Sequence, residues 1–158
     1  MTAVPAPWSL VVFAARESLP TLSRAVQAAT LAAGGRAHID VLVNGNPALA
    51  SAFLHHMEPQ AVAPNAPRVR VWTLAVSDKA HAWNQYIRHI WSGEEIAFFM
   101  DGYVRLKPDA LTLLGEAVRT NTQVLGGTGV PSVGRTAQAM RQQMLRELCV
   151  RASLSFIV

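Results

Sequence analysis

Residues 94–111 have the sequence EEIAFFMDGYVRLKPDAL, the most specific pattern in the chain. The segment Glu94–Met100 ends in a continuous apolar run, which predicts a strand that helices cover on both faces and that lies centrally in its sheet. Asp101–Lys107 is expected to be a loop. Pro108 suits the first turn of a helix and predicts one that runs to about Thr120. A strand, a polar loop and a helix are therefore predicted in succession.

The same alternation occurs three more times before residue 94. Short β-rich apolar runs alternate with segments in which apolar residues recur at helical spacing. This alternation is typical of an α/β domain, here a Rossmann-like, mostly parallel sheet flanked by helices. The predicted strands are Ser9–Ala14, Ala37–Val43 and Arg68–Thr73, the predicted helices are Leu19–Ala33, Ala48–Met57 and Lys79–Trp91, and Glu58–Pro67, with three prolines, is a loop.

The C-terminal part continues the pattern less regularly. Val124–Thr128 predicts a short fifth strand, Gly126–Pro131 a loop and Ala137–Val150 a helix. The final Ala152–Val158 is apolar and looks like the beginning of another element, so the fold is expected to be incomplete at its C-terminus. Exposed apolar patches of this kind favour association, and we expect a homo-oligomer with contacts from about residues 137–158.

The composition is that of a folded protein. The chain has 158 residues, of which 51% are apolar and 15% are charged, and this balance excludes intrinsic disorder. No apolar run approaches the roughly 18 residues of a spanning helix, and the N-terminus lacks the basic start of a secretion signal. We therefore expect a cytoplasmic protein without a transmembrane segment, with peripheral attachment to a membrane as the alternative.

The charge and the single cysteine exclude two further classes. Fourteen Lys and Arg against ten Asp and Glu give a net charge of +4, but residues 120–158, with four arginines and one glutamate, carry +3 of it, which leaves +1 for residues 1–119. A basic tail on a nearly neutral body does not predict a nucleic-acid partner. Cys149 alone excludes an internal disulfide framework and a zinc site built mainly on thiolates.

The expected site lies at the carboxyl ends of the strands, where open parallel sheets bind ligands. The loops that begin at Ala14, Asn44, Thr73 and Asp101 are those to search. None of them carries a Walker loop, a Gly-x-Gly-x-x-Gly turn, a Cys-x-x-Cys pair or a His-Glu-x-x-His motif. The polar residues of these loops are therefore the remaining candidates.

Their order resembles the donor half of the inverting family 2 glycosyltransferases, which have the GT-A fold. Phe13-Ala-Ala-Arg-Glu17 occupies the place of the family's first loop, and Val43-Asn-Gly-Asn46 that of its acidic turn. The resemblance spans about residues 9–131 and leaves 132–158 as a basic, apolar C-terminal segment of the same single domain, 1–158. The matching positions are Glu17 and Leu19 after the first strand, Lys79, Ala82 and Asn84 after the third, and Asp101, Pro108, Asp109 and Leu111 after the fourth.

The resemblance implies binding of a UDP-, GDP- or dTDP-linked sugar and its transfer, with inversion, to an unknown acceptor. It places Asp101 near the diphosphate or a divalent cation, Asn44 at the base, and Lys79 and Asn84 at the ribose or phosphates. The implied site residues are Ala14, Glu17, Asn44, Lys79, Asn84 and Asp101. In the family the third position of Asp-x-Asp usually binds Mg²⁺ or Mn²⁺; here it is Tyr103, a poor ligand, so any metal is expected to need the diphosphate.

The sequence leaves several interpretations of these residues and of the function open. Asp101, Glu17 and the Asn44-Gly45 pair also suit purely structural roles in turns and first helical turns. Beyond Asp109 the chain has only Glu116 and Glu147, neither in the acidic pair that carries the family's catalytic base. The chain is thus either part of a longer enzyme or a noncatalytic module that acts in nucleotide binding or protein interaction. A nucleotidyltransferase is less favoured, because the first loop is not glycine-rich.

Overall fold

The computed structural model describes residues 7–57 and 68–121, together with Gln123, residues 126–129, Gln138 and Gln142. The chain divides into two compact units, Met1–Asn121 and Thr122–Val158. The division thus falls ten residues before the end of the region that resembles the glycosyltransferases. All helices and strands described below belong to the first unit.

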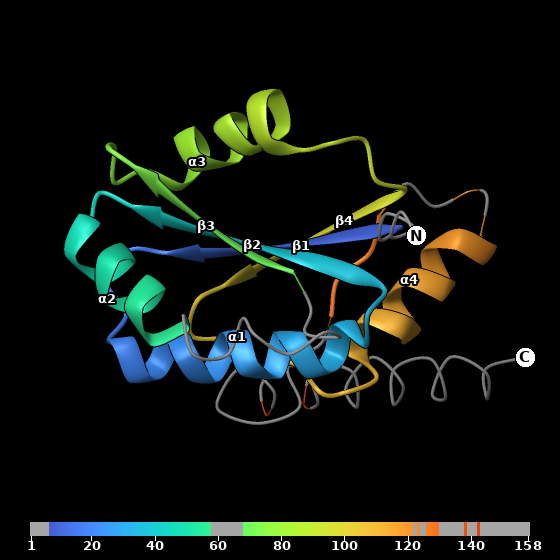
Figure 1. Ribbon diagram of the computed structural model, residues 1–158. Coiled ribbons are helices and arrows are strands. Elements are labelled where there is room, and N and C mark those ends of the chain that lie inside the picture. The colour runs from blue at the N-terminus through green and yellow to red at the C-terminus, as the bar shows by residue number, and fades with distance from the viewer. Residues whose placement is uncertain are drawn as a thin grey trace, which may run out of the picture. The chain divides into compact units, whose positions relative to one another are not determined.

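Four parallel strands form the sheet, in the order β3-β2-β1-β4. The predicted α/β class with a parallel sheet is confirmed in this part of the chain. Each strand is followed by a helix, as Figure 1 shows. The strands are β1 (Trp8–Ala14), β2 (Ala37–Asn44), β3 (Val69–Leu74) and β4 (Ile96–Asp101), and the helices are α1 (Leu19–Ala33), α2 (Pro47–Met57), α3 (Lys79–Gln85), the π-helix η2 (Tyr86–Ile90) and α4 (Ala110–Thr120).

Helices cover both faces of the sheet, with α1, α2 and α4 on one face and α3 and η2 on the other (Figure 1). The period of two along β1 explains the two layers, because successive side chains point to opposite faces. Leu10 and Val12 belong to the larger core with α1 and α2. Val11 and Phe13 pack with Tyr86 in the smaller core under α3 and η2.

The strand order creates a switch point between β1 and β4. From β1 the chain adds β2 and then β3 on one side, and it returns through α3 to place β4 on the other side of β1. In open parallel sheets ligands bind outside the carboxyl ends of the strands at such a point. Phe13, near the end of β1, pairs with Leu42 and with Asp101. Consequently the ends of three strands meet there.

One predicted detail is wrong, and one predicted helix is present but changes its type along its length. Among the described strands, β4 pairs only with β1, so it lies at one end of the sheet and not at its centre. Its apolar run is less buried than β1, because Phe98 and Met100 alone fall in the core. The predicted helix over 79–91 changes from an α-helix to a π-helix at Tyr86.

Some predictions concern parts that lie outside the described residues. These are the loop 58–67, the first two residues of the fifth strand, and most of the C-terminal helix and the apolar segment to which we assigned self-association. Residues 126–129 form neither strand nor helix, whereas Gln138 and Gln142 are helical. In 7–57 and 68–121, no helix combines the length and the apolar character needed to cross a bilayer.

Candidate functional site

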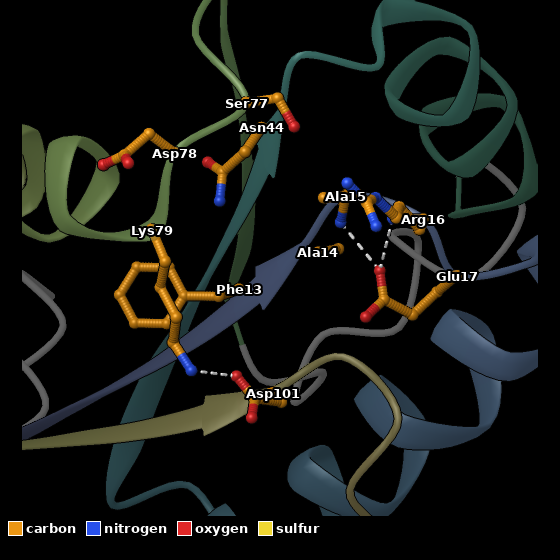
Figure 2. Close-up of a pocket in the computed structure, with 10 residues that line it drawn as sticks. All are labelled: Phe13, Ala14, Ala15, Arg16, Glu17, Asn44, Ser77, Asp78, Lys79 and Asp101. Carbon is orange, nitrogen blue, oxygen red and sulfur yellow. Dashed lines mark hydrogen bonds and ion pairs between the residues drawn. The ribbon is translucent and has the colours of Figure 1, made fainter.

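The loops at the carboxyl ends of the strands enclose a pocket of about 250 Å³. Figure 2 shows this space between residues of β1, β2 and β4 and residues that follow β3. The pocket brings together five of the six site residues predicted from the sequence. Its lining consists of Phe13, Ala14, Ala15, Arg16, Glu17, Asn44, Ser77, Asp78, Lys79 and Asp101.

The sixth predicted residue, Asn84, does not line the pocket. It lies exposed on α3. The reason is helical phase, since Ala82 and Tyr86 are the buried residues that face the sheet, and a residue two positions from each of them points away from it. The predicted role of Asn84 at the ribose or phosphates therefore has no support from its position.

Asn44 is the most informative residue of the pocket. It is the last residue of β2 and is only 4% exposed. Its side-chain oxygen is buried without a hydrogen-bond partner among the described residues. Leaving such a group unpaired costs about 1–3 kcal/mol, and buried polar groups without partners often mark a ligand or water position. Because this oxygen has almost no accessible surface, a donor group of a bound ligand would remove this cost only once the side chain turns the oxygen toward the pocket.

Glu17 shapes the loop after β1. Its carboxylate accepts hydrogen bonds from the backbone N–H groups of Ala15, at 2.7 Å, and Arg16, at 3.0 Å. Asn46, which the sequence analysis did not single out, donates to the Ala15 carbonyl at 2.9 Å and accepts from the Leu49 N–H at 3.0 Å. These contacts join the loops after β1 and β2, so Glu17 and Asn46 hold the pocket wall.

Asp101 is engaged on both carboxylate oxygens. Lys79 forms an ion pair with one, and the Tyr103 hydroxyl donates to the other at 3.0 Å. Lys79 also lies over the Phe13 ring, 5.6 Å from its centroid. The hydrogen bond to Asp101 raises the pKa of Tyr103, so the phenol stays protonated at neutral pH. A protonated phenol is a poor metal ligand.

Each of the three carboxylates of the pocket is engaged by a neighbouring group. Glu17 is bound to loop amides, Asp78 caps α3 by accepting from the His81 N–H, and Asp101 is paired with Lys79. No three His, Cys, Asp or Glu side chains come together as a metal site in the described part of the chain. Asp101 could still act as one carboxylate ligand if a diphosphate supplied others, which is how Mg²⁺ often binds.

Gly45 allows the loops after β2 and β3 to approach each other. Its φ is +64°, and a Cβ atom at this position would lie 2.6 Å from the Ser77 Cβ. The Gly45 N–H donates to the Leu74 carbonyl at 2.7 Å. Only glycine fits both the left-handed backbone and the contact.

Gly45→Ala is therefore expected to lower the free energy of unfolding by more than the about 1–2 kcal/mol that a left-handed residue costs by itself. Urea denaturation would measure the change. Gly34→Ala is the matched control, because Gly34 also has a positive φ, +52°, but open space around it. Equal losses in the two variants would show that the contact with Ser77 has no energetic weight.

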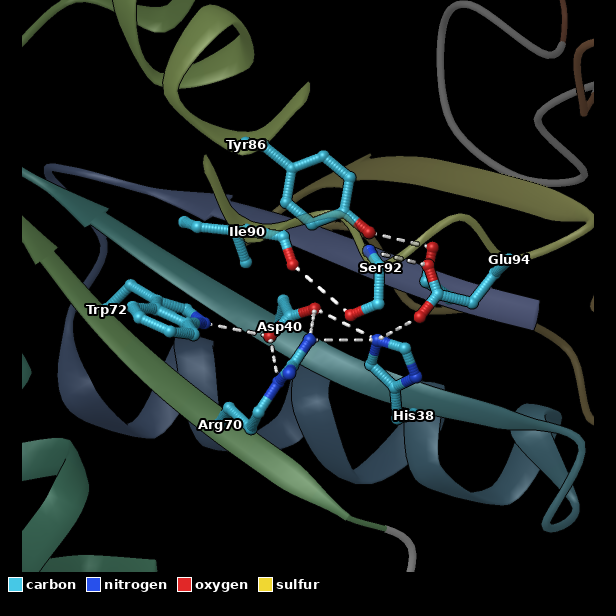
Figure 3. A network of polar contacts seen from close by, with 9 residues as sticks. His38, Asp40, Arg70, Trp72, Tyr86, Ile90, Ser92 and Glu94 are labelled. Carbon is cyan, nitrogen blue, oxygen red and sulfur yellow. Dashed lines mark hydrogen bonds and ion pairs between the residues drawn. The ribbon is translucent and has the colours of Figure 1, made fainter. Parts of the chain in front are cut away.

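A buried polar network that the sequence analysis missed lies on the face of the sheet that α3 and η2 cover (Figure 3). Asp40, on β2, is fully buried and accepts two hydrogen bonds from Arg70, both at 2.7 Å, and one from Trp72 at 2.8 Å. His38 Nε2 lies 3.2 Å from Asp40 and 3.5 Å from Glu94. This network ties β2 and β3 to the segment after η2.

The network sets the charge state of Asp40. Burial alone would raise the pKa of this carboxyl, but the hydrogen bonds from His38, Arg70 and Trp72 hold it below its ordinary value. Tyr86 completes the packing, and its hydroxyl donates to Ser9 at 2.7 Å. Burial raises the pKa of Tyr86 to about 12. The network thus has the character of a structural core and does not line the pocket.

None of the described acidic residues after Asp109 lies in the pocket. Glu116, the one acidic residue after Asp109 in the described part of the chain, lies on α4 and outside the pocket lining. It forms ion pairs with Arg36 at 3.5 Å and Arg119 at 3.3 Å.

A search of family models finds none that matches this chain, and no curated protein matches it.

Proposed function

We propose that the pocket binds a nucleoside diphosphate as part of a nucleotide-sugar donor, and that this chain is the donor-binding domain of an inverting glycosyltransferase. The unpaired, buried oxygen of Asn44 is the observation that carries the proposal. A base presents N–H groups beside carbonyl groups, and an asparagine amide can pair with both. Asn44 is thus the base-contacting residue of the proposal.

The charges of the lining fit a diphosphate that arrives with a cation. Two cationic side chains, Arg16 and Lys79, stand against three carboxylates. A diphosphate would therefore need further positive charge. Asp101 would hold Mg²⁺ or Mn²⁺ together with the diphosphate, and the bound cation would neutralise charge on the leaving group. Lys79, released from Asp101, would donate to a phosphate oxygen.

Calorimetry of the full chain with UDP, GDP, CDP and dTDP, in Mn²⁺ and in EDTA, tests the proposal. We expect one of the four to bind in the roughly micromolar to millimolar range typical of substrates, and more tightly with Mn²⁺ than with EDTA. Mn²⁺ alone should give no heat, because Asp101 is its only carboxylate ligand here. No binding of any of the four in either buffer would remove the proposed function.

Replacing Asn44 by alanine separates binding from stability. The Asn44 side-chain oxygen has no hydrogen-bond partner within the described residues. Its removal relieves the cost of an unpaired buried group, so the free energy of unfolding should not fall by more than about 1 kcal/mol. Nucleotide affinity should fall by up to about tenfold, the equivalent of one hydrogen bond. The matched control is Asn84→Ala, on the exposed face of α3, which should leave affinity unchanged. Equal affinities in the two variants would exclude Asn44 from the site.

A noncatalytic nucleotide-binding module is the second candidate. The observation that favours it is that Glu116, the one described acidic residue after Asp109, lies outside the pocket lining and is paired with two arginines. Hydrolysis or transfer assays with the nucleotide sugar that corresponds to the bound diphosphate distinguish the two. Binding with no turnover by the full chain would favour the module.

A further inference from the structure

A second pocket, of about 270 Å³, lies beside the proposed donor site. Thr21 and Arg24 from the first two turns of α1 and Tyr103 and Arg105 from the loop after β4 line it. Tyr103 links the two pockets, because its hydroxyl donates to Asp101, a residue of the first pocket. Both pockets thus open at the carboxyl end of the sheet.

The lining of this second pocket offers only cations and hydroxyls. Within the part of the chain that the structure describes, neither guanidinium has a hydrogen bond or an ion pair. Asp101, the neighbouring carboxylate, is paired with Lys79 and so does not neutralise them. Two arginines that line one cavity without a carboxylate give it a positive potential, which favours an anion.

The chemistry of these groups favours a phosphate group. Guanidinium groups bind phosphate through two parallel N–H donors each. A carboxylate has two oxygens and is satisfied by one arginine, whereas a phosphate monoester has three terminal oxygens and up to two negative charges. Two guanidiniums therefore match a phosphate better. The Tyr103 hydroxyl donates to Asp101 and the Thr21 hydroxyl is bonded to Ser18, so the arginines supply the donors. The volume is slightly below the about 300–1,000 Å³ of typical small-molecule pockets.

We propose that Arg24 and Arg105 bind a phosphate group carried by the acceptor, the second substrate of the proposed transferase. The inference rests on the proposed function, since only the neighbouring donor pocket makes the bound molecule an acceptor. The link through Tyr103 and Asp101 places such a phosphate next to the donor diphosphate. The acceptor is accordingly a phosphorylated molecule.

The test uses the full chain with ¹⁵N-labelled arginine and follows the Nε–Hε resonances at constant ionic strength. Phenyl phosphate is the probe, benzoate is the carboxylate comparison, and each is titrated with and without saturating UDP and Mn²⁺. Arg24→Gln and Arg105→Gln assign the resonances and test the site. Arg88→Gln is the matched control, because Arg88 is exposed on η2 and lines neither pocket.

Phenyl phosphate should shift the Arg24 and Arg105 resonances saturably and leave Arg88 unshifted. Each of the two variants should weaken binding at least about tenfold, whereas Arg88→Gln should stay within about twofold. UDP should change the affinity for phenyl phosphate by less than about threefold. Benzoate should bind at least about tenfold more weakly.

Several results would overturn the inference. Shifts of equal size at Arg88 would mean nonspecific attraction, and equal binding of benzoate would exclude a phosphate-selective site. Displacement of phenyl phosphate by UDP would assign the pocket to the phosphates of the donor. If phenyl phosphate binds but no nucleoside diphosphate does, the phosphate site stands while the proposed function and the acceptor assignment fail together. Because both arginines are exposed and have no partner among the described residues, the variants should keep the melting temperature of the unmodified chain.

Discussion

Replacing Asp40 by alanine is expected to lower the free energy of unfolding by about 3–5 kcal/mol, the usual cost of breaking a buried ion pair from one side. The Asp40 carboxylate is fully buried and accepts hydrogen bonds from Arg70 and Trp72. Without it, the Arg70 guanidinium, which is only about a quarter exposed, loses its ion-pair partner. This is the largest stability effect that we expect in the chain.

Urea denaturation at pH 7 measures the effect, with Asp109→Ala as the control. Asp109 is exposed and makes no side-chain hydrogen bond at the start of α4, so its loss should cost less than about 1 kcal/mol. A loss of under 1 kcal/mol for Asp40→Ala would contradict the structural role of the network.

The stability difference between the unmodified chain and Asp40→Ala should also depend on pH. The pKa of Asp40 is lower in the folded chain than its ordinary value of 3.8. Its contribution is therefore fully present above the unfolded pKa and is lost as the pH falls through the folded one. Unfolding free energies of the two proteins should run parallel from pH 7 to about pH 5 and converge below about pH 4. A constant difference down to pH 2 would mean that the charge of Asp40 carries no stability.

Replacing Asp101 by asparagine should change nucleotide binding in opposite directions with and without a cation. In Mn²⁺, the affinity for the bound nucleoside diphosphate should fall at least about tenfold, because the cation loses its carboxylate ligand. In EDTA, affinity should stay equal or rise, because a negative charge is removed and Lys79 becomes free to meet the phosphates. Calorimetry of the variant and the unmodified chain in both buffers measures these affinities.

The stability of Asp101→Asn should change little, since the ion pair with Lys79 is largely exposed and exposed pairs contribute at most about 1 kcal/mol. Asp109→Asn serves as the matched control for charge and should leave affinity unchanged in both buffers. A fall in affinity of the same size in EDTA and in Mn²⁺ would assign Asp101 a role that does not involve a cation.

The α/β class with a parallel sheet and the clustering of strand-end residues around one pocket could be predicted, because both follow from local patterns. Helix α1 begins and ends where predicted, since Ser18 caps its first turn and Gly34 takes the left-handed conformation at its end. The rule that ligands bind at the carboxyl ends of parallel strands led to Asn44 and Asp101, which indeed line one pocket. These inferences need only the order of the elements.

What could not be predicted depends on pairing between distant residues. Asp40 and Arg70 face each other because β2 and β3 pair in a register that aligns these two positions, and no single-sequence pattern specifies that register. The prediction that β4 lies at the centre of the sheet failed for a similar reason, because an apolar run indicates burial but not which neighbours a strand has. The position of Asn84 could not be predicted either, because it depends on which face of α3 packs against the sheet. In sequence alone, Arg24 and Arg105 look like ordinary surface arginines.

The most direct test of the proposed function is the response of the asparagine side-chain amides in an NMR titration with the tightest-binding nucleoside diphosphate. The chain offers an internal comparison, because Asn44 lies buried in the pocket and Asn84 lies exposed on α3. We predict a saturable shift of the Asn44 amide, with the dissociation constant measured by calorimetry, and no shift of the Asn84 amide. An Asn44 amide that stays unchanged at saturating nucleotide, or that moves no more than that of Asn84, would contradict this prediction.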